Sequence, residues 1–358
     1  VIAAGIYPPH PGGPALHAKH YVEELPQMGI PTRLVAFSPL LGYPKGIRHG
    51  IYLWKLFWKA LHSRAIFAQD ISSAGYPAYL IARFLARPLF VRIGGDIAWE
   101  SAAAVGGTQK SMLEWYASGE GVQSRLFPYG KKILGRAKRV MVPTELLRHV
   151  YRDYYGVPDA KIVVIPNPVD ATQTRELERA TPPGEKRTLL FASRLVAYKN
   201  LPFVIGSIAR IQGSVPSFRF VICGDGPEFE ALGKLVADRH LEEVVELWGR
   251  VSESEVALLT EEAWCTIAPA FTEFNPNFVL RGLASGVPFL ISAENGLPFR
   301  VPEQFLFNAR NGEQLDERLR CILSDKGHAD AEQLLRELPA LDSWATFLSK
   351  VVTFLRTP

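Results

Sequence analysis

Short apolar runs alternate with amphipathic stretches along the whole chain. In the first half, the strand-like runs are 1–7, 32–37, 65–69, 89–93, 139–143 and 161–165. Segments with helical spacing, such as 15–27, 78–85 and 144–155, lie between them. Near-continuous apolar strands separated by amphipathic helices are typical of a parallel sheet covered on both faces. The pattern predicts a doubly wound α/β domain.

A second alternation of the same kind fills the other half. Its strand-like runs are 188–192, 218–223, 244–248, 265–269 and 288–291, and its helical segments are 201–211, 227–238, 254–260 and 277–284. The polar stretch 167–186, which contains Thr181-Pro-Pro-Gly, separates the halves and predicts a linker. In the tail, Trp344, Phe347, Val351 and Phe354 recur every three or four residues, which predicts a final packing helix.

Composition supports two ordinary globular domains. The chain has 358 residues, of which 47% are hydrophobic and 21% charged, enough apolar material for two cores. A net charge of +4 is too small to indicate a nucleic-acid partner. Cys223 and Cys265 lie in apolar runs and are expected to be core residues in a reducing cytoplasm. Because Val1 already begins a strand, no leader segment is expected, and no run is long enough to cross a bilayer.

The stretch 272–291, TEFNPNFVLRGLASGVPFLI, carries the most chemistry. It predicts a loop, a helix over 277–284 and a buried strand, with Asn275 as the helix N-cap and Pro276 in the first turn. The acidic Glu273 lies on the loop that leaves the preceding strand. Open α/β sheets bind ligands at this end of their strands.

Two cations follow the first strand of the second half. Arg194 and Lys199 lie on a loop, and Asn200 is expected to cap the next helix. Cations beside a helix N-terminus can bind a diphosphate, because the backbone N–H groups and the helix dipole add to the charge. The alternative is that they are merely solvated surface residues.

Glycine-rich turns follow three further strands. Gly12-Gly13 precedes the first helix and can let a ligand approach the backbone closely. Gly224-Asp-Gly226-Pro and Gly249-Arg250 follow strands of the second half, and each can equally be a tight structural turn. The third glycine of a dinucleotide fingerprint is lacking, so NAD binding is not expected.

Taken in order along the chain, these segments resemble the motifs of glycosyltransferase family 4. The resemblance covers the Gly-Gly loop, the junction IPNPVD, the Arg/Lys loop, the Gly-Asp-Gly-Pro turn and the Glu273 region. It implies the α/β GT-B fold: two Rossmann-like domains facing each other across a cleft. Residues 1–166 would be the acceptor-side domain, 167–340 the donor-binding domain, and 341–358 a helix returning to the first domain.

The resemblance also implies an activity, namely transfer of a sugar from a UDP- or GDP-sugar to an acceptor hydroxyl with retention, without a metal or other cofactor. Arg194 and Lys199 would bind the diphosphate, and Glu273 the sugar. The implied donor-binding residues are Gly12, Gly13, Gly224, Arg250, Phe274, Asn275, Asn277 and Arg281. The acceptor would be a carbohydrate or a lipid-linked molecule in polysaccharide or glycolipid synthesis, at the cytoplasmic membrane face.

Two features of the first half admit both a functional and a structural interpretation. Asp96 ends the stretch 90–96, where the family carries a polar residue near the donor sugar, but it can also be a helix-capping aspartate. Trp54 and Trp58, with Lys55 and Lys59 beside them, form an aromatic and cationic helix. That helix can contact a membrane or a lipid-linked acceptor, or can simply cover the sheet.

The chain departs from the family at Arg281. The family has a second glutamate there, eight positions after the first, which accepts hydrogen bonds from ribose, whereas arginine only donates. Three explanations are open: other groups bind ribose, Arg281 pairs with Glu273 or a phosphate, or donor binding is weak. A non-catalytic sugar- or nucleotide-binding homologue is therefore one alternative function. A GT-B epimerase or phosphorylase and a periplasmic-type binding protein are others.

Overall fold

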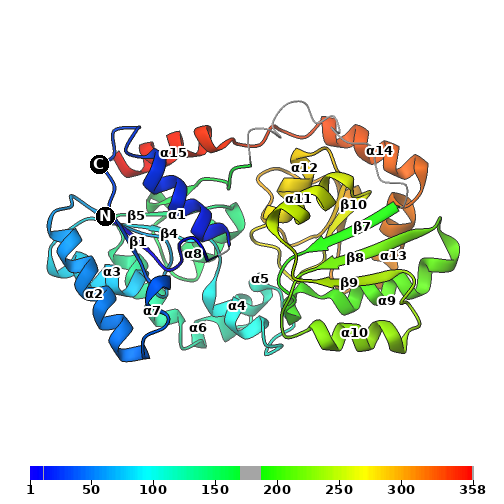
Figure 1. The fold of residues 1–358 in the computed structure, drawn as a ribbon, viewed down its shortest axis with the longest axis horizontal. Coiled ribbons are helices and arrows are strands. Elements are labelled where there is room, and N and C mark those ends of the chain that lie inside the picture. The colour runs from blue at the N-terminus through cyan, green and yellow to red at the C-terminus, as the bar shows by residue number, and fades with distance from the viewer. Residues whose placement is uncertain (11, 170–186, 357–358) are drawn as a thin grey trace. The chain divides into compact units, whose positions relative to one another are not determined.

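The computed structural model describes residues 1–10, 12–169 and 187–356. The chain divides into two compact units (Figure 1). Unit 1 comprises Val1–Glu100, Leu113–Asn167 and Trp344–Pro358, and unit 2 comprises Ser101–Met112 and Pro168–Ser343. The short segment Ser101–Met112 thus belongs with the second half of the chain. Most of the predicted linker, residues 170–186, lies outside the described residues.

Unit 1 is built on a parallel sheet of six strands in the order β2-β1-β3-β4-β5-β6. The strands are β1 (Ile2–Ala4), β2 (Leu34–Ala36), β3 (Ile66–Ala68), β4 (Leu89–Arg92), β5 (Arg139–Val142) and β6 (Ile162–Val164). Its longer helices are α1 (Gly13–Glu24), α2 (Lys45–Leu61), α3 (Gly75–Phe84), α7 (Phe127–Arg136) and α8 (Glu145–Asp153). The shorter ones are α6 (Glu120–Gln123) and two helices that lie mostly in unit 1, α4 (Ile97–Ala103), whose last turn belongs to unit 2, and α5 (Met112–Ala117), whose first residue does. All six predicted strands of this half are confirmed.

The last helix, α15 (Trp344–Arg356), packs into the core of unit 1. The ring of Phe354 lies 5.5 Å from that of Phe90 on β4 and 6.0 Å from that of Phe67 on β3. Phe347 is fully buried against Tyr21 of α1. The predicted return of the final helix to the first domain is therefore confirmed.

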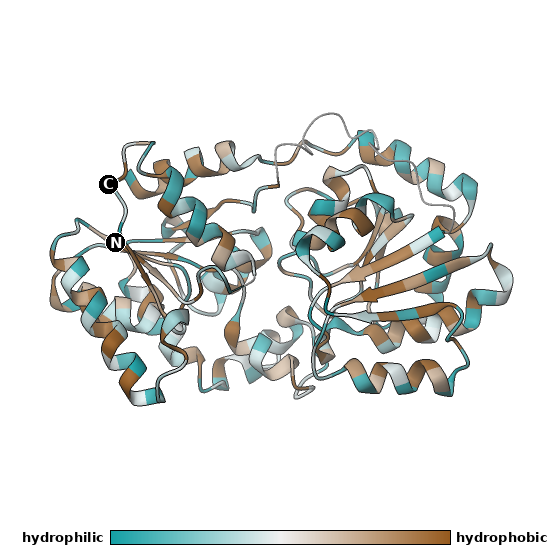
Figure 2. Ribbon diagram, in the orientation of Figure 1, coloured by the Kyte–Doolittle hydropathy of each residue, from teal (hydrophilic) through white to brown (hydrophobic). Residues whose placement is uncertain are grey.

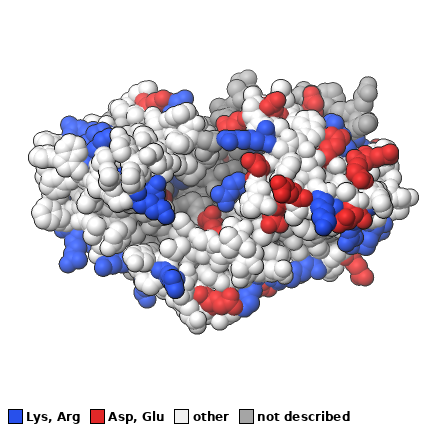
Figure 3. Space-filling model, turned by 60° about the horizontal axis from the view of Figure 1, so that its bottom comes forward, with Lys and Arg blue, Asp and Glu red and all other residues white. Residues whose placement is uncertain are grey.

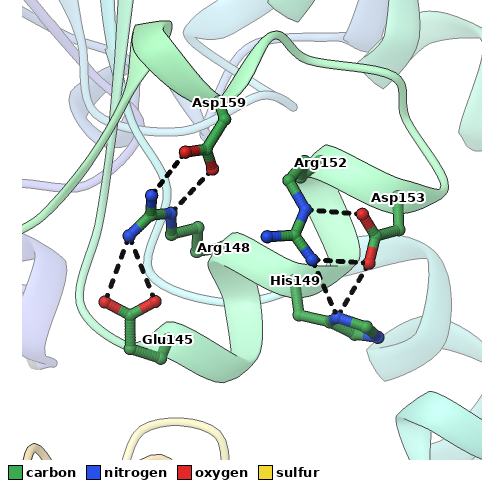
Figure 4. Close-up of polar contacts among 6 residues, drawn as sticks. All are labelled: Glu145, Arg148, His149, Arg152, Asp153 and Asp159. Atoms are coloured by element: carbon green, nitrogen blue, oxygen red, sulfur yellow. Dashed lines mark hydrogen bonds and ion pairs between the residues drawn. The ribbon is translucent and has the colours of Figure 1, made fainter.

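Exposed ion pairs connect α8 to the turn before β6 (Figure 4). Arg148 donates to both carboxylate oxygens of Asp159, at 2.9 Å from Nε, and lies near Glu145 on its own helix. One turn further on, Arg152 pairs with Asp153. Solvent screens such pairs, so each contributes little to stability. We assign this network a structural role.

Unit 2 contains a second parallel sheet, in the order β12-β11-β10-β7-β8-β9. The strands are β7 (Arg187–Ala192), β8 (Phe218–Cys223), β9 (Val245–Gly249), β10 (Cys265–Ala268), β11 (Phe289–Ser292) and β12 (Leu306–Phe307). The helices are α9 (Leu201–Ile211), α10 (Phe229–Asp238), α11 (Glu253–Glu262), α12 (Asn277–Ala284), α13 (Gly312–Ile322) and α14 (Asp325–Arg336). The hydrophobic pattern did not predict β12, α13 or α14.

The strands of both sheets consist mainly of hydrophobic residues, as their largely brown colour in Figure 2 shows. In unit 2, Cys223 on β8 and Cys265 on β10 are buried among aliphatic and aromatic side chains, so their predicted core role is confirmed. Within the described residues, no helix has the length and apolar character needed to span a membrane.

The strand order reverses once in each sheet. In unit 2 the chain starts at β7, runs outward to β8 and β9, and then returns to the other side of β7 to form β10, β11 and β12. The loops after β7 and β10 therefore diverge, and such a switch point at the carboxyl ends of the strands is where open α/β sheets bind ligands. In unit 1 the corresponding point lies between β1 and β3.

Candidate active site

Lys199 and Glu273 meet at the switch point of unit 2. Lys199 ends the short turn after β7, and Glu273 lies on the loop after β10. The ammonium group donates a hydrogen bond of 2.6 Å to Oε2 of Glu273, and both side chains are 9% exposed. The pair is thus held in surroundings with little water, where charges interact more strongly than at the surface.

The backbone of Glu273 is fixed from both sides by the loop after β11. Its N–H donates to the carbonyl of Glu294 at 3.0 Å, and its own carbonyl accepts from the N–H of Gly296 at 2.9 Å. Among the described residues, Oε1 of Glu273 takes no hydrogen bond, and this atom can accept one from a ligand hydroxyl. The carboxylate is therefore positioned before any ligand arrives.

Asn200 does not cap α9 as predicted. Its backbone is left-handed, with φ of +57°, and its side chain accepts no hydrogen bond from the helix. Instead the amide donates to the carbonyls of Pro269, at 3.3 Å, and Ala309, at 2.9 Å. This side chain connects the start of α9 to the loops after β10 and β12, which places Lys199 next to Glu273.

The glycines of the Gly-Asp-Gly-Pro turn let the Arg194 loop lie directly on it. Gly224 has φ of +148°, and a Cβ atom there would lie 1.9 Å from the carbonyl oxygen of Ser193. The N–H of Leu195 donates to the backbone carbonyl of Asp225 at 2.9 Å, and this bond holds the two loops together. The structure thus gives Gly224 a packing role. Arg194 itself is exposed, and no side-chain partner for it is found in the described part of the chain, so its guanidinium can bind an anion.

Glu294 is a site residue that the sequence analysis missed. Its carboxylate accepts hydrogen bonds of 2.5 Å from the hydroxyls of Thr272 and Ser111. Thr272 also accepts from the backbone N–H of Met112 at 2.7 Å. Together these bonds attach the segment Ser101–Met112 to the Glu273 loop. Its position could have identified it, because an acidic residue two positions after the strand β11 lies at the ligand-binding end of the sheet.

The remaining donor-side residues lie on the same edge of the sheet or on α12. Arg250 follows β9 and is exposed, whereas Phe274, which follows Glu273, is buried. Asn275 is not the N-cap of α12: the helix starts at Asn277, its N-cap position is Pro276, and no side chain caps it. Asn277 is exposed in the first turn.

Arg281 lies on α12 and does not pair with Glu273. It is half-buried, and no ion pair of its side chain is found within the described residues. The carboxylate of Glu273 is already bonded to Lys199. The suggestion that Arg281 pairs with Glu273 is therefore wrong. Three alternatives stay open: Arg281 pairs with a phosphate, other groups bind ribose, or donor binding is weak.

In unit 1, Asp96 is fully buried and caps α4. One carboxylate oxygen accepts from the N–H of Trp99 at 2.8 Å, and the other from the hydroxyls of Tyr116, at 2.8 Å, and Tyr155, at 3.2 Å. Burial raises the pKa of Asp96, and these hydrogen bonds oppose the rise. An enclosed carboxylate with three donors has no exposed atom for a sugar, so the capping interpretation replaces the expected contact with the donor.

The Gly-Gly loop lies where α1 begins. Gly12 is the N-cap residue with φ of +125°, a conformation that glycine adopts without strain, and Gly13 is the first helical residue. One turn further, His17 is buried, with its ring 5.0 Å from that of Trp344 and 5.1 Å from that of Phe347. His17 is thus a packed core residue.

Unit 1 also holds an apolar cavity of about 560 Å³. It lies at the carboxyl edge of the sheet, because Ile71–Ser73 follow β3 and Ile97 begins α4. Its other apolar walls come from α2, α3 and the region of α7: Leu53, Tyr76, Leu80, Leu126 and Tyr129. A cavity of this size and character can hold the apolar part of a small ligand.

Two family models match this chain. The model described as "Glycosyl transferases group 1" matches residues 172–336, and that described as "Glycosyltransferase Family 4" matches residues 11–173. Together they cover both units. The chain belongs to glycosyltransferase family 4.

Curated relatives are similar over part of their length. A component of the phosphatidylinositol N-acetylglucosaminyltransferase of Arabidopsis thaliana is 25% identical over 53% of this chain and 42% of its own length. A putative colanic acid biosynthesis glycosyltransferase, WcaL, of Salmonella typhimurium is 28% identical over 40% and 36%. A GDP-mannose-dependent phosphatidylinositol monomannoside mannosyltransferase of Mycobacterium tuberculosis is 26% identical over 56% and 57%. The matches thus span between about a third and three fifths of these relatives.

Solved structures match the whole chain. Anabaena HepE in complex with UDP-glucose superposes with a TM-score of 0.71 at 15% identity, covering 99% of both chains. A sucrose-phosphate synthase from Thermosynechococcus elongatus gives a TM-score of 0.69 at 16% identity, over 99% of this chain and 95% of the other. With two Rossmann-like domains and these neighbours, the fold is GT-B, as the sequence predicts.

Proposed function

We propose that this protein transfers a sugar from a nucleotide-sugar to an acceptor hydroxyl, with retention at the anomeric carbon and without a metal. The observation that carries the proposal is the buried Lys199–Glu273 pair at the switch point of unit 2, with the exposed Arg194 on the same loop as Lys199. The site thereby offers cations for a diphosphate and a fixed carboxylate for a sugar.

The chemistry follows from these charges. As the bond to the sugar breaks, negative charge grows on the leaving diphosphate, and positioned cations stabilise that charge. Arg194 is free to form a bidentate contact with phosphate oxygens, whereas Lys199 contributes a fixed positive charge. Oε1 of Glu273 accepts a hydrogen bond from a sugar hydroxyl, and the hydrogen bond to Lys199 keeps the carboxylate in place.

The choice of donor and acceptor is supported by the relatives. The neighbour HepE binds UDP-glucose, and a curated relative is named as GDP-mannose-dependent, so both nucleotides are candidates. Several relatives are named for lipid acceptors. A carbohydrate acceptor carrying a lipid also fits the apolar cavity of unit 1. We therefore propose a lipid-linked acceptor in glycolipid or polysaccharide assembly.

The test is turnover of UDP- and GDP-sugars, measured as release of the nucleotide, with and without EDTA. We expect one nucleotide class to be turned over, equally in both conditions, and Arg194→Ala to lower kcat/KM by about a hundredfold. Lys234→Ala, which removes an exposed cation on α10, is the matched control and should leave turnover unchanged. Equal turnover by wild type and Arg194→Ala would overturn the assignment.

A second candidate is a nucleotide-sugar-binding homologue without turnover. It is favoured by Arg281, which supplies only donors where the family has an acceptor. Calorimetric titration with UDP, GDP and their sugars separates the two candidates. Binding without release of nucleotide at any donor would establish the non-catalytic function.

A further inference from the structure

Helix α2 of unit 1 is apolar on two opposite faces. Tyr52, Leu56 and Ala60 are fully buried against the rest of unit 1. Ile47, Trp54 and Trp58 lie on the other side, within about 40° of one another around the helix axis. They are 55%, 63% and 51% exposed. Solvent-facing helix positions are normally polar, whereas this outer stripe is apolar. Its exposure shows that no other segment in the described part of the chain covers it.

The apolar surface continues onto α3. The ring of Phe84 is 78% exposed and lies 6.0 Å from that of Phe57 on α2, so the two helices share one face. Lys55 on α2 and Arg83 on α3 are exposed beside these aromatic residues, and neither has an ion-pair partner among the described residues. We call Ile47, Trp54, Trp58, Phe84, Lys55 and Arg83 the α2–α3 face.

The charge around this face is strongly one-sided. Residues 25–95, which include α2 and α3, contain nine Lys and Arg residues and one acidic residue, Asp70. The rest of the chain has 31 Lys and Arg against 35 Asp and Glu, because the totals are 40 and 36. In Figure 3 the part formed by unit 1 shows mostly blue among white, whereas unit 2 shows both colours. Of these nine cations only Arg92 is buried, so the segment that contains α2 and α3 presents a strongly basic surface.

We propose that the α2–α3 face docks onto the surface of an anionic lipid bilayer. Tryptophan is suited to the interface of a membrane, because its ring is apolar and its N–H group still reaches water. A helix lying in that interface presents apolar and aromatic residues to the lipid and Lys or Arg to the headgroups. The α2–α3 face has both features, and the charge selects an anionic bilayer over a neutral protein surface.

Docking in this way would bring the apolar cavity of unit 1 to the membrane. Leu53 of α2 and Leu80 of α3 line the apolar cavity of about 560 Å³, so the helices of the α2–α3 face also form its wall. A lipid-linked molecule could then enter without crossing water. This role for the cavity rests on the proposed function, whereas the docking itself does not depend on sugar transfer and is tested without a donor.

The experiment is flotation of the full chain with vesicles of phosphatidylcholine alone or mixed with phosphatidylglycerol. We expect binding to the anionic vesicles, much weaker binding to the neutral ones, and loss of binding as salt rises above about 0.1 M, where surface charges are screened. Trp54→Ala/Trp58→Ala should weaken binding about tenfold or more. Lys55→Glu/Arg83→Glu should weaken it by at least about twenty-five-fold, since each cation at such a surface contributes about fivefold.

Matched controls come from unit 2. Leu258 on α11 is 60% exposed, and Lys234 on α10 is exposed, so Leu258→Ala and Lys234→Glu remove the same kinds of group elsewhere. Both should bind as wild type does. Because all the substituted side chains are exposed, each variant should keep the wild-type circular dichroism spectrum.

Two results would overturn the proposal. One is equal binding of the wild type and the α2–α3 variants to anionic vesicles. The other is a wild-type dimer in light scattering that Trp54→Ala/Trp58→Ala converts to a monomer, with vesicle binding absent; the face would then be covered by a second copy of the chain.

Discussion

The ammonium group of Lys199 donates a hydrogen bond of 2.6 Å to the carboxylate of Glu273, a residue 74 positions further along the chain. The two side chains come from the loops after β7 and β10, which are neighbouring strands only because the chain order reverses between them. The bond therefore joins the first and fourth strands of unit 2 at its ligand-binding edge.

Breaking this pair from one side should destabilise unit 2 strongly. Lys199→Met leaves the buried carboxylate of Glu273 without its counter-charge, and we expect a loss of about 3–5 kcal/mol in the free energy of unfolding. In the double variant Lys199→Met/Glu273→Leu the two charges are gone, and most of that loss should be recovered. Urea unfolding of the wild type, the two single variants and the double variant measures the coupling.

The exposed Arg148–Asp159 pair of Figure 4 is the control for this cycle. Arg148→Ala should cost far less stability than Lys199→Met, because water already screens both charges. If Lys199→Met were as mild as Arg148→Ala, the Lys199–Glu273 pair would not be a buried one in solution.

Gly224 should not tolerate a side chain. In Gly224→Ala the new methyl group would lie 1.9 Å from the carbonyl oxygen of Ser193, and φ of +148° is unfavourable for alanine. We expect a loss on the order of 3 kcal/mol in stability and weaker nucleotide binding, because the Arg194 loop must move. Thermal unfolding and calorimetric titration measure the two effects.

Gly233 on α10 offers the opposite outcome. No atom lies within 4 Å of a Cβ atom built there, and the residue is inside a helix. Gly233→Ala should therefore stabilise the protein by about 0.5–1 kcal/mol and leave nucleotide binding unchanged. A Gly224→Ala variant that behaves like Gly233→Ala would show that the turn does not support the Arg194 loop.

Acid should destabilise unit 1 through His17. Burial, followed by the charges of Arg92 and His20, lowers the pKa of His17 well below its ordinary value of 6.5. Below pH 6.5 the unfolded chain binds a proton at this histidine and the folded chain does not, so stability falls with falling pH. The contribution is about 1.4 kcal/mol per pH unit while folded His17 stays neutral.

The measurement is the difference in pH dependence between wild type and His17→Phe, from urea unfolding between about pH 5 and 8, the range that brackets an ordinary histidine. The phenylalanine can pack beside Trp344 and Phe347 but does not titrate, so its stability should fall less steeply in acid. Identical slopes for wild type and His17→Phe would mean that His17 is protonated in the folded state.

Arg281→Glu restores the acceptor group that the family carries on α12. Since Arg281 makes no ion pair within the described residues, we expect the variant to fold normally and to bind the nucleotide no more tightly than wild type. If Arg281 contacts a phosphate, binding should weaken. A gain of more than about tenfold, or about 1.4 kcal/mol, would instead indicate a donor site impaired by Arg281.

The elements of the fold were predictable because their cause is local. The bounds of β8, α9 and α12 match the prediction residue for residue, since each is a complete apolar or amphipathic run with polar or glycine-rich ends. The shortest strand, β12, has only two residues and carries no period that sequence analysis can detect. The positions of the candidate ligand-binding loops were likewise predictable, because such loops follow directly after strands.

The partners of individual side chains were not predictable. Asp96 and Glu294 are both acidic residues that follow strands. Asp96 is buried and accepts hydrogen bonds from two tyrosine hydroxyls, whereas Glu294 accepts them from a serine and a threonine of unit 2. Nothing in their local sequences distinguishes these outcomes, because burial depends on which helices cover the strand end. The same holds for Asn200, whose amide contacts residues 69 and 109 positions away.

The sequence by itself therefore determined two α/β domains, their strands and helices, and the loops on which Arg194, Lys199 and Glu273 lie. Hydrophobic periodicity and turn chemistry act over a few residues, and they are complete in the sequence. Only the tertiary structure decided that Lys199 pairs with Glu273, that Asp96 is enclosed, and that the aromatic stripe of α2 faces outward. These depend on strand order and on packing between distant segments, which no local pattern encodes.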